Sequence, residues 1–265
     1  MSTSKNVNEL FNQAHNEGTL SAQSMQTIQI LDPGAQINNA LGIKVDDVQA
    51  SEVVLVSLLV DDSGSIRFAG NADVVREGHN GCLDALSKSK QKDNVLVHTR
   101  YLNGQILYPY CALDGATKMD THNYNPNGGT PLNDETVTML ATVLAKCQEF
   151  KANGVPCRTV TLIVTDGRDE HSHKTTVSQV AHLVKDMLMQ ETHIIAAMGI
   201  DDGVTNFKAV FSEMGIRPEW ILTPANTQSD IRKAFGVFSQ SAVRASQSAA
   251  SFSKTAGGGL GGFTA

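Results

Sequence analysis

A run from Val53 to Val60 that is apolar except for Ser57 constrains the fold of this chain more than any other segment. Strands that expose one face to solvent alternate apolar and polar residues, and this run does not alternate. It therefore predicts a central strand that is covered on both faces. The polar residues Asp61-Asp62-Ser63-Gly64-Ser65 follow directly, so the strand leads into a loop rich in side-chain oxygens.

Strand-like and helix-like segments alternate along the rest of the chain. Strands are predicted at 95–102, 159–165, 194–198 and 220–222, and helices at 75–86, 137–147, 177–187, 207–214 and 231–242. Such alternation predicts parallel strands, right-handed crossovers and helices on both faces. Asn103-Gly104 lies between two strand-like runs and is a hairpin signal. The predicted fold class is α/β, with a doubly wound, mostly parallel central sheet and one antiparallel edge strand.

The length of 265 residues is that of one α/β domain with short additions. Residues 51–245 contain the alternating segments and are predicted to form the domain. Residues 1–50 are an N-terminal extension without an assigned role, and Thr27-Ile28-Gln29-Ile30 within it alternates as a short edge strand would. Residues 246–265 are rich in Ser, Ala and Gly, which predicts a flexible tail.

Charge and composition exclude several classes of function. The net charge of −6 argues against a surface for nucleic acid or an anionic membrane. The first residues are polar, unlike a signal peptide, and the apolar runs are too short to span a bilayer, so the expected location is the cytoplasm. The 4 cysteines form no CxxC pair, so we expect reduced thiols in or near the core.

Acidic and hydroxyl side chains follow two of the predicted buried strands. Asp61, Ser63 and Ser65 stand at alternate positions after the first strand, and Asp166 directly follows the strand at 159–165. Ligands of doubly wound sheets bind beyond the carboxyl ends of the strands, where the chain order reverses. If these strands are neighbours there, the side chains face one crevice, which the loop carrying Thr130 can cover. Hard oxygen ligands of this kind favour magnesium.

These residues resemble a known metal site, the metal-ion-dependent adhesion site (MIDAS) of von Willebrand factor A (VWA) domains. Three separated pieces carry the resemblance: Asp61-x-Ser63-x-Ser65, Thr130 in a Gly-Gly-Thr-Pro-Leu turn, and Asp166-Gly167 after a buried strand. They occur in the family's order, and the resemblance covers residues 52–238. A lone Asp-x-Ser-x-Ser would be a weak signal, whereas the combination is specific.

The resemblance implies a role for each residue. Ser63, Ser65 and Thr130 would give hydroxyl oxygens to Mg2+, or to Mn2+ or Ca2+ in its place. Asp61 and Asp166 would bind the ion directly or through water. One coordination position is then left for an aspartate or glutamate of a protein partner. The ion is expected to act as a bridge, and the chain is not expected to be an enzyme.

Within that family, the chain is similar to bacterial intracellular proteins with a single A domain. The segment Phe235 to Ser241 is similar to the carboxyl end of A-domain proteins found with bacterial tellurite-resistance and kinase/phosphatase systems. Other bacterial A domains work beside AAA+ ATPases. The resemblance therefore implies an adaptor in a multiprotein system and leaves the choice between these partners open.

Simpler interpretations exist for several polar residues. Asp and Ser after a strand often cap the following helix, and only the combination with the other two pieces favours a metal. Asp62 is expected to point to solvent. The pair His171-x-His173 is expected to lie in a solvated loop rather than form a second metal site. His79 lies on an apolar helix face and is expected to be a packed core residue.

The alternative function is a metal-dependent phosphoryl-transfer hydrolase or a nucleotide-binding enzyme on the same kind of sheet. The sequence has no Gly-x-x-x-x-Gly-Lys-[Ser/Thr] loop, no Gly-x-Gly-x-x-Gly opening a helix after a strand, and no Gly-x-Ser-x-Gly elbow around Ser63. Ser63 also stands where a haloacid-dehalogenase-type phosphatase has a second aspartate. These observations favour a binding function.

Overall fold

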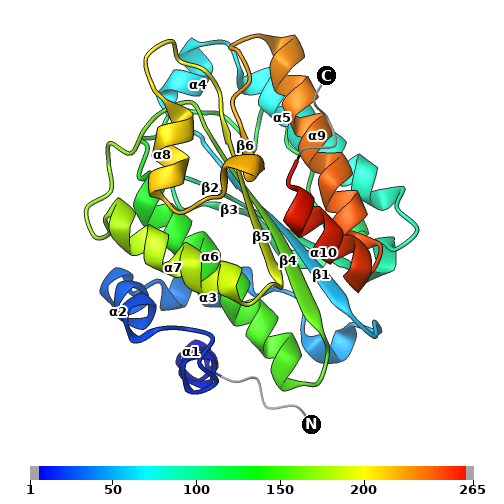
Figure 1. Cartoon of the computed structure of the whole chain (residues 1–265). Helices are drawn as coiled ribbons and strands as arrows, with labels where there is room; N and C mark the ends of the chain where they lie inside the picture. Colours follow the sequence, from blue (N-terminus) through cyan, green and yellow to red (C-terminus); the bar gives the residue numbers. More distant parts are fainter. Residues whose placement is uncertain (1–5, 261–265) are drawn as a thin grey trace.

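A six-stranded sheet forms the centre of the computed structural model, which describes residues 6–260 (Figure 1). The strands are β1 (Val53–Val60), β2 (Val95–Tyr101), β3 (Ile106–Ala112), β4 (Cys157–Thr165), β5 (His193–Gly199) and β6 (Ile221–Leu222). Their order is β3-β2-β1-β4-β5-β6, and every neighbouring pair is parallel except β2 with β3. The predicted fold class is confirmed, including the antiparallel edge strand.

The burial of each strand follows its place in the sheet. All eight residues of β1 are buried between β2 and β4, as its nearly continuous apolar run predicts. The edge strand β3 is buried only in part. Gly104 in the turn between β2 and β3 has a φ of 85°, a conformation that costs glycine little and other residues more. The Asn103-Gly104 signal thus places the hairpin correctly.

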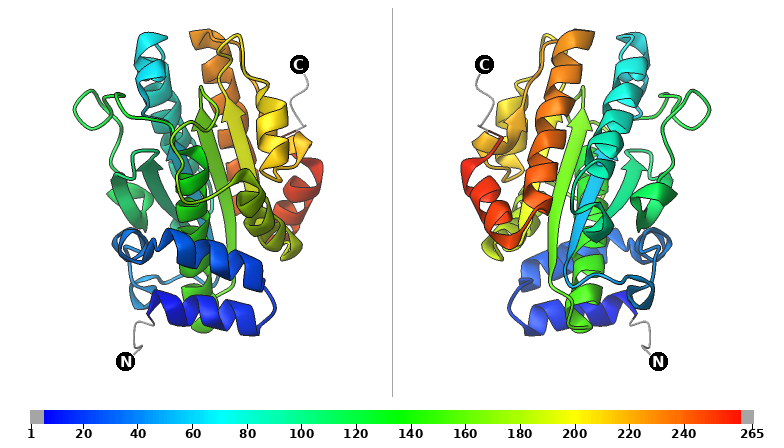
Figure 2. Two further views of the ribbon diagram at one scale, coloured as in Figure 1. Left: turned by 90° about the vertical axis from the view of Figure 1, so that its left-hand side faces the viewer. Right: turned by 90° about the vertical axis from the view of Figure 1, so that its right-hand side faces the viewer.

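Helices cover both faces of the sheet (Figure 2). On one face lie α5 (Ala72–Ser87), α9 (Gln228–Ser246) and α10 (Ala249–Gly258), and on the other lie α6 (Leu132–Ala152), α7 (Val177–Met189) and α8 (Phe207–Glu213). The short helix α4 (Gly64–Phe68) follows β1 at the carboxyl end of the parallel strands. Single 3-10 turns lie at Val45–Asp47, Lys92–Asn94, Leu113–Gly115 and Pro218–Trp220.

Three N-terminal helices form an additional layer outside α6, at the opposite end of the molecule from α4 (Figures 1 and 2). They are α1 (Val7–Asn16), α2 (Ala22–Leu31) and α3 (Gly34–Ala40). The predicted strand at residues 27–30 is wrong, because these residues lie within α2. The buried residues of α2 recur at helical spacing, at positions 24, 27, 28 and 31, but two are hydroxyl residues that obscure the apolar pattern.

The predicted flexible tail is wrong for residues 249–258, which form α10. Ser248 caps this helix by accepting a hydrogen bond from the backbone N–H of Ser251. Phe252 is buried, and the indole Nε1 of Trp220 donates to the carbonyl of Ala256 at 3.3 Å. A cap, a buried aromatic side chain and a hydrogen bond from Trp220 therefore dock this Ser/Ala-rich segment. Residues 261–265 of the predicted tail lie outside the described residues.

Two smaller predictions are confirmed. His79 is a buried core residue, with Nε2 lying 3.1 Å from the hydroxyl of Thr99. The cysteines are free thiols, and only Cys111 is partly exposed. Within residues 6–260, no helix has the length and apolar character needed to cross a membrane.

Candidate metal centre

The carboxyl ends of β1 and β4 meet where the chain order of the sheet reverses. The chain leaves β1 for β2 on one side and returns as β4 on the other. Val60 is paired with Val164, and the backbone N–H of Asp61 donates to the carbonyl of Val164 at 3.0 Å. Asp61 and Asp166 therefore lie at one edge of the sheet, as the sequence predicts for a ligand site at a switch point.

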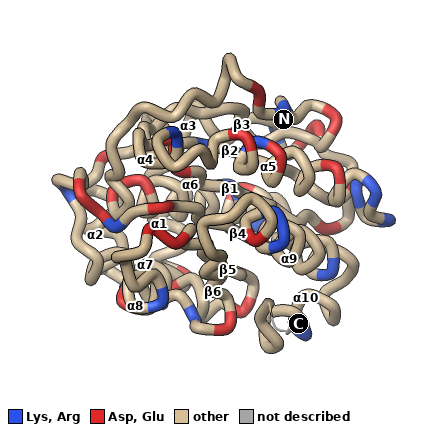
Figure 3. The backbone as a smooth tube through the Cα atoms, turned by 90° about the horizontal axis from the view of Figure 1, so that it is seen from above, with Lys and Arg blue, Asp and Glu red and all other residues tan. Residues whose placement is uncertain are grey.

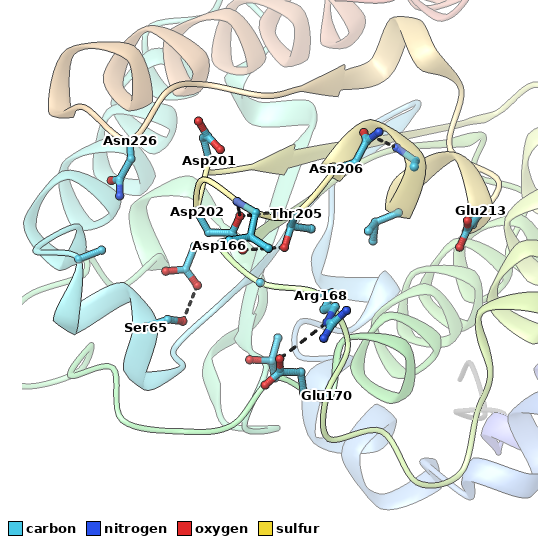
Figure 4. A pocket seen from close by; sticks show the side chains of 16 residues that line it. Ser65, Asp166, Arg168, Glu170, Asp201, Asp202, Thr205, Asn206, Glu213 and Asn226 are labelled. Atoms are coloured by element: carbon cyan, nitrogen blue, oxygen red, sulfur yellow. Dashed lines mark hydrogen bonds and ion pairs between the residues drawn. The ribbon is translucent and has the colours of Figure 1, made fainter.

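The loop after β1 links the predicted residues by hydrogen bonds. The backbone N–H of Ser63 donates to Oδ1 of Asp61 at 2.7 Å. The hydroxyls of Ser63 and Ser65 lie 2.8 Å apart, and the Ser65 hydroxyl donates to Oδ1 of Asp166 at 2.6 Å (Figure 4). Four of the five predicted residues thus form one continuous chain of contacts.

Thr130 reaches the same place from the loop before α6. The segment preceding it lies beside the β1 loop, where the backbone N–H of Gly64 donates to the carbonyl of Gly128 at 3.1 Å. On its other side, the carbonyl of Thr130 accepts from the N–H of Glu170 at 3.1 Å. Thr130, Ser65 and Asp166 line a common cavity of about 580 Å³. The structure therefore brings the three separated pieces of the motif together.

Further polar side chains surround this cavity (Figure 4). They come from the loop after β4, the segment around α8 and the loop between β6 and α9, and are Arg168, Glu170, Asp201, Asp202, Thr205, Asn206, Glu213 and Asn226. Arg168 and Glu170 face each other at 3.9 Å. An ion held by the hydroxyls would thus face an open space rather than a closed cage.

The oxygen spacing fits a small divalent cation. Neighbouring ligands on an octahedron around Mg2+ lie about 3 Å apart. The Ser63–Ser65 and Ser65–Asp166 oxygens are hydrogen bonded at 2.8 and 2.6 Å, so they are near enough to act as neighbouring ligands of one ion. Within residues 6–260 no group of three or more His, Cys, Asp or Glu side chains is placed to hold a metal. Any ion at this site would therefore depend on the hydroxyls.

Asp61 holds the loop with both of its carboxylate oxygens. Oδ1 accepts from the Ser63 N–H, and Oδ2 accepts from the hydroxyl of Thr165 at 2.6 Å. Tyr124 adds a third tie, because its hydroxyl donates to the backbone carbonyl of Asp61. Asp61 thus positions the serine hydroxyls, and its charge would act on an ion from behind them.

Burial makes the ionised forms of the two carboxylates unfavourable, so a bound cation would stabilise them. Burial raises the pKa of Asp61. Burial also raises the pKa of Asp166 to about 6, and the charge of Asp61 adds to this effect. Removing two neighbouring carboxylates from water disfavours their ionised forms. A divalent cation between them and the hydroxyls would reverse that effect.

Asp62 does not point to solvent, so this expectation is wrong. Its side chain is 5% exposed, and Oδ1 accepts from the N–H of Asn103 at 3.0 Å. Its carbonyl accepts from the N–H groups of Asn127 and Gly128 at 2.8 and 2.9 Å. Asp62 therefore ties the β2–β3 hairpin to the loop that carries Thr130. These partners are distant in sequence, which is why the local pattern did not reveal them.

His171 has a structural role that the sequence did not reveal. Its Nδ1 accepts from the backbone N–H of Thr130 at 2.9 Å, and the ring lies so close to Gly129 that a Cβ there would be 2.9 Å from Cγ. His173 is held differently, since its backbone N–H donates to Asp134. His171 through its ring and His173 through its backbone N–H therefore fix the loops around Thr130.

The same fold occurs in several solved structures. The pilus adhesin SpaC from Lactobacillus rhamnosus GG in its open conformation matches 73% of this chain with a TM-score of 0.56 and 15% identity. A von Willebrand factor type A structure from Catenulispora acidiphila matches 74% with a TM-score of 0.52 and 17% identity. Proximal thread matrix protein 1 from the mussel byssus matches 72% with a TM-score of 0.50 and 18% identity.

The fold is that of a VWA domain. The matches cover 30%, 43% and 46% of those three chains, so this VWA fold spans less than half of each. No protein-family model matches the sequence, and no match was found among curated proteins. At these identities the similarity establishes the fold alone.

Proposed function

We propose that this VWA domain binds a divalent cation with Ser63, Ser65 and Thr130 and uses it to bind an acidic residue of a protein partner. The observation that carries the proposal is the Ser63–Ser65–Asp166 chain of oxygens, which opens onto the cavity beside Thr130. These oxygens come from distant segments and converge at the switch point of the sheet, where such folds bind their ligands.

The donor set favours a bridging role. The three hydroxyls are neutral and would hold the ion, while Asp61 and Asp166 supply negative charge beside them. An ion bound in this way is less neutralised than one in a cage of carboxylates, so it keeps affinity for a further anionic oxygen. Bound there, the cation would supply an open coordination position for a carboxylate of the partner.

The proposal extends to the physiological setting. Mg2+ is the proposed ion, with Mn2+ or Ca2+ as substitutes at a site made of oxygens. The proposed role is that of an adaptor in a bacterial multiprotein system in the cytoplasm, beside a kinase/phosphatase or tellurite-resistance system or an AAA+ ATPase. This part rests on the resemblance of the motif and of the segment around Phe235.

We also propose that the site binds rather than catalyses. The hydroxyls of Ser63 and Ser65 contact each other, and that of Ser65 also donates to Asp166. The proposal of binding rests on the sequence around these serines, which has no Gly-x-Ser-x-Gly elbow of the kind that presents a serine nucleophile. Phosphate release from general phosphatase substrates by the pure protein with Mg2+ would contradict this proposal.

Calorimetric titration with Mn2+ and Mg2+ tests the metal site. We expect one ion per chain, with affinity lost in Thr130→Ala and Ser65→Ala because each change removes a ligand oxygen. Ser212→Ala is the matched control, since this exposed serine lies on α8 outside the site. Equal binding by all three variants would contradict the proposed site.

A pull-down from the native host tests the partner. Wild type is compared with Thr130→Ala, each with and without chelator. A protein lost both on chelation and in the variant identifies the metal-dependent partner. A set of captured proteins that neither treatment changes would contradict the proposed function.

A further inference from the structure

The end of the molecule that carries Ser63, Ser65 and Thr130, here called the metal end, has two strongly exposed apolar side chains. Phe68 is 81% exposed at the end of α4, and Val204 is 92% exposed in the segment between β5 and α8. Isolated exposed apolar residues are common and need no explanation by themselves. The position of Phe68 is different, because α4 begins within the loop that carries the Ser63 and Ser65 hydroxyls.

The Phe68 ring lies directly beside that loop. A Cβ added to Gly64 would lie 3.4 Å from Cε2 of the ring, so the ring lies over the open side of the residue between the two serines. The guanidinium of Arg67 lies 5.0 Å from the ring centroid, and its Nη2 donates to Oδ1 of Asn127 at 3.0 Å. Arg67 therefore links the ring to the loop that leads to Thr130.

Val204 adjoins the site from another direction. It lines the same cavity as Ser65 and Thr130. Its backbone is fixed by Asp202, whose Oδ1 accepts from the N–H groups of Val204 and Thr205 at 2.9 and 2.6 Å. The hydroxyls of the site thus have an apolar neighbour on α4 and another on the β5–α8 loop.

Charge narrows the kind of partner that fits this surface. Figure 3, seen from this end, shows acidic and basic residues interspersed rather than gathered in one large area of a single sign. The guanidinium of Arg67, however, lies against the Phe68 ring. A bound cation would add a second positive charge beside the ring. The acidic residues that line the cavity on the Val204 side are Glu170, Asp201 and Asp202. It is therefore the Phe68 and Arg67 side that complements an acidic segment.

We propose that Phe68 and Arg67 form a second contact for the partner, next to the ion. The partner segment then carries an acidic residue that binds the ion and, within three residues of it, an apolar side chain that packs on the Phe68 ring. Arg67 pairs with further negative charge in the same segment. This inference rests on the proposed function and specifies the partner: a short acidic stretch that includes an aromatic or aliphatic residue.

Selection of short random peptides displayed on phage, with wild type and Mg2+, tests the inference. We expect the peptides that chelator releases to contain Asp or Glu with an apolar residue within three positions. Phe68→Ala should weaken their binding on the order of tenfold, as truncation of an aromatic contact residue commonly does. Arg67→Gln should weaken it less, through the lost charge.

Two controls separate this contact from other effects. Met189→Ala removes another strongly exposed apolar side chain, at the end of α7, and should leave peptide binding unchanged. Phe68→Ala should bind Mn2+ as wild type does, because the ring supplies no ligand oxygen. Both side chains are exposed, so both variants should fold.

The outcomes distinguish the two proposals. Metal-dependent peptides that lack a nearby apolar residue, or that bind Phe68→Ala as tightly as wild type, overturn the Phe68 contact and leave the metal bridge intact. Peptides that bind equally with chelator, or no metal-dependent peptide at all, overturn the metal bridge and this inference with it. A dimer in sedimentation experiments that Phe68→Ala dissolves would assign the ring to a second copy and overturn the inference.

Discussion

The metal end and the N-terminal helical layer lie at opposite ends of the molecule, and they are stabilised in different ways (Figure 1). At the metal end, buried carboxylates and hydroxyls hold loops together through hydrogen bonds. In the layer, α1 to α3 pack apolar side chains such as Leu10 and Ile37 into the same hydrophobic cluster as the sheet. Burying charged side chains at the metal end lowers the free energy of unfolding, whereas the apolar contacts of the helical layer raise it.

Truncation of a buried side chain in the helical layer tests that difference, and it should cause the largest loss of stability. Leu10 is 1% exposed, so Leu10→Ala should lower the free energy of unfolding by about 2–5 kcal/mol. Urea unfolding with chelator measures this loss, and Mn2+ affinity of the folded variant should equal that of wild type. Asn12→Ala, an exposed change on the same helix, should alter neither quantity. A loss of Mn2+ affinity in Leu10→Ala would show that the two ends are coupled.

Removal of charge at the metal end should lower Mn2+ affinity without lowering stability, which is the opposite of the effect expected for Leu10→Ala. Asp61→Asn keeps the size of the side chain and one oxygen acceptor, but it removes a buried negative charge from behind the hydroxyls. We expect Mn2+ affinity to fall by about 10 to 100-fold, as for other residues that position metal ligands. Because burial raises the pKa of Asp61, the metal-free variant should unfold at the same or a higher temperature than wild type. A clearly lower Tm would show that Asp61 is needed for folding.

The two ends also differ in how well the sequence predicts them. At the metal end, the alternation of strands with helices and the positions of Asp61 and Asp166 at strand ends followed from short-range patterns, whereas the order of the strands did not. Each of these two positions is fixed by the end of a strand, and the switch point brings these ends together.

The roles of Asp62, Tyr124 and His171 could not be predicted in this way, because their partners come from distant segments. Thr165, which directly precedes Asp166, could have been noticed as a nearby hydroxyl.

The helical layer and α10 show the reverse situation. Local alternation in residues 27–30 suggested a strand, but packing against α6 and α7 buries the face of α2 that carries Ser24 and Thr27. Likewise, the composition of residues 246–265 suggested no structure, but Phe252 docks α10 beside α9. Marginal helices of this kind are decided by tertiary contacts more than by propensity.

Lowering the pH should weaken metal binding at the metal end. The pKa of Asp166 is raised to about 6, so protons compete with the ion below that pH. Between about pH 7.5 and pH 5, protonation of one such carboxyl should reduce Mn2+ affinity about tenfold. The dependence should be weaker in Asp166→Asn, whose residual affinity reports the other carboxylates. An affinity that stays constant over this range would contradict a role for Asp166 as an ionised group at the ion.

The same shifts give the sign of the pH dependence of stability. Asp62 and Asp166, both with a pKa raised to about 6, hold protons in the folded state that the unfolded chain has already lost above about pH 4. Their contribution to the free energy of unfolding of the metal-free protein therefore falls as pH rises from about 4 to 6. Saturating Mg2+ should offset this loss above pH 6. Unfolding followed at several pH values, with chelator or Mg2+, measures both effects.

Asp62→Asn should have the smallest effect on Mn2+ affinity, which would distinguish the role of Asp62 from that of its neighbour Asp61. Asp62→Asn keeps an oxygen that can accept from the Asn103 N–H, so the hairpin should stay tied to the Thr130 loop. It removes one charge that is near the site but bonded away from the hydroxyls, and Mn2+ affinity should fall only about threefold. Asp62→Ala removes the acceptor as well and should lower affinity further, because the loop carrying Thr130 loses a support. If Asp62→Asn reduced affinity as strongly as Asp61→Asn, Asp62 would act on the ion directly and the division of roles between the two aspartates would be wrong.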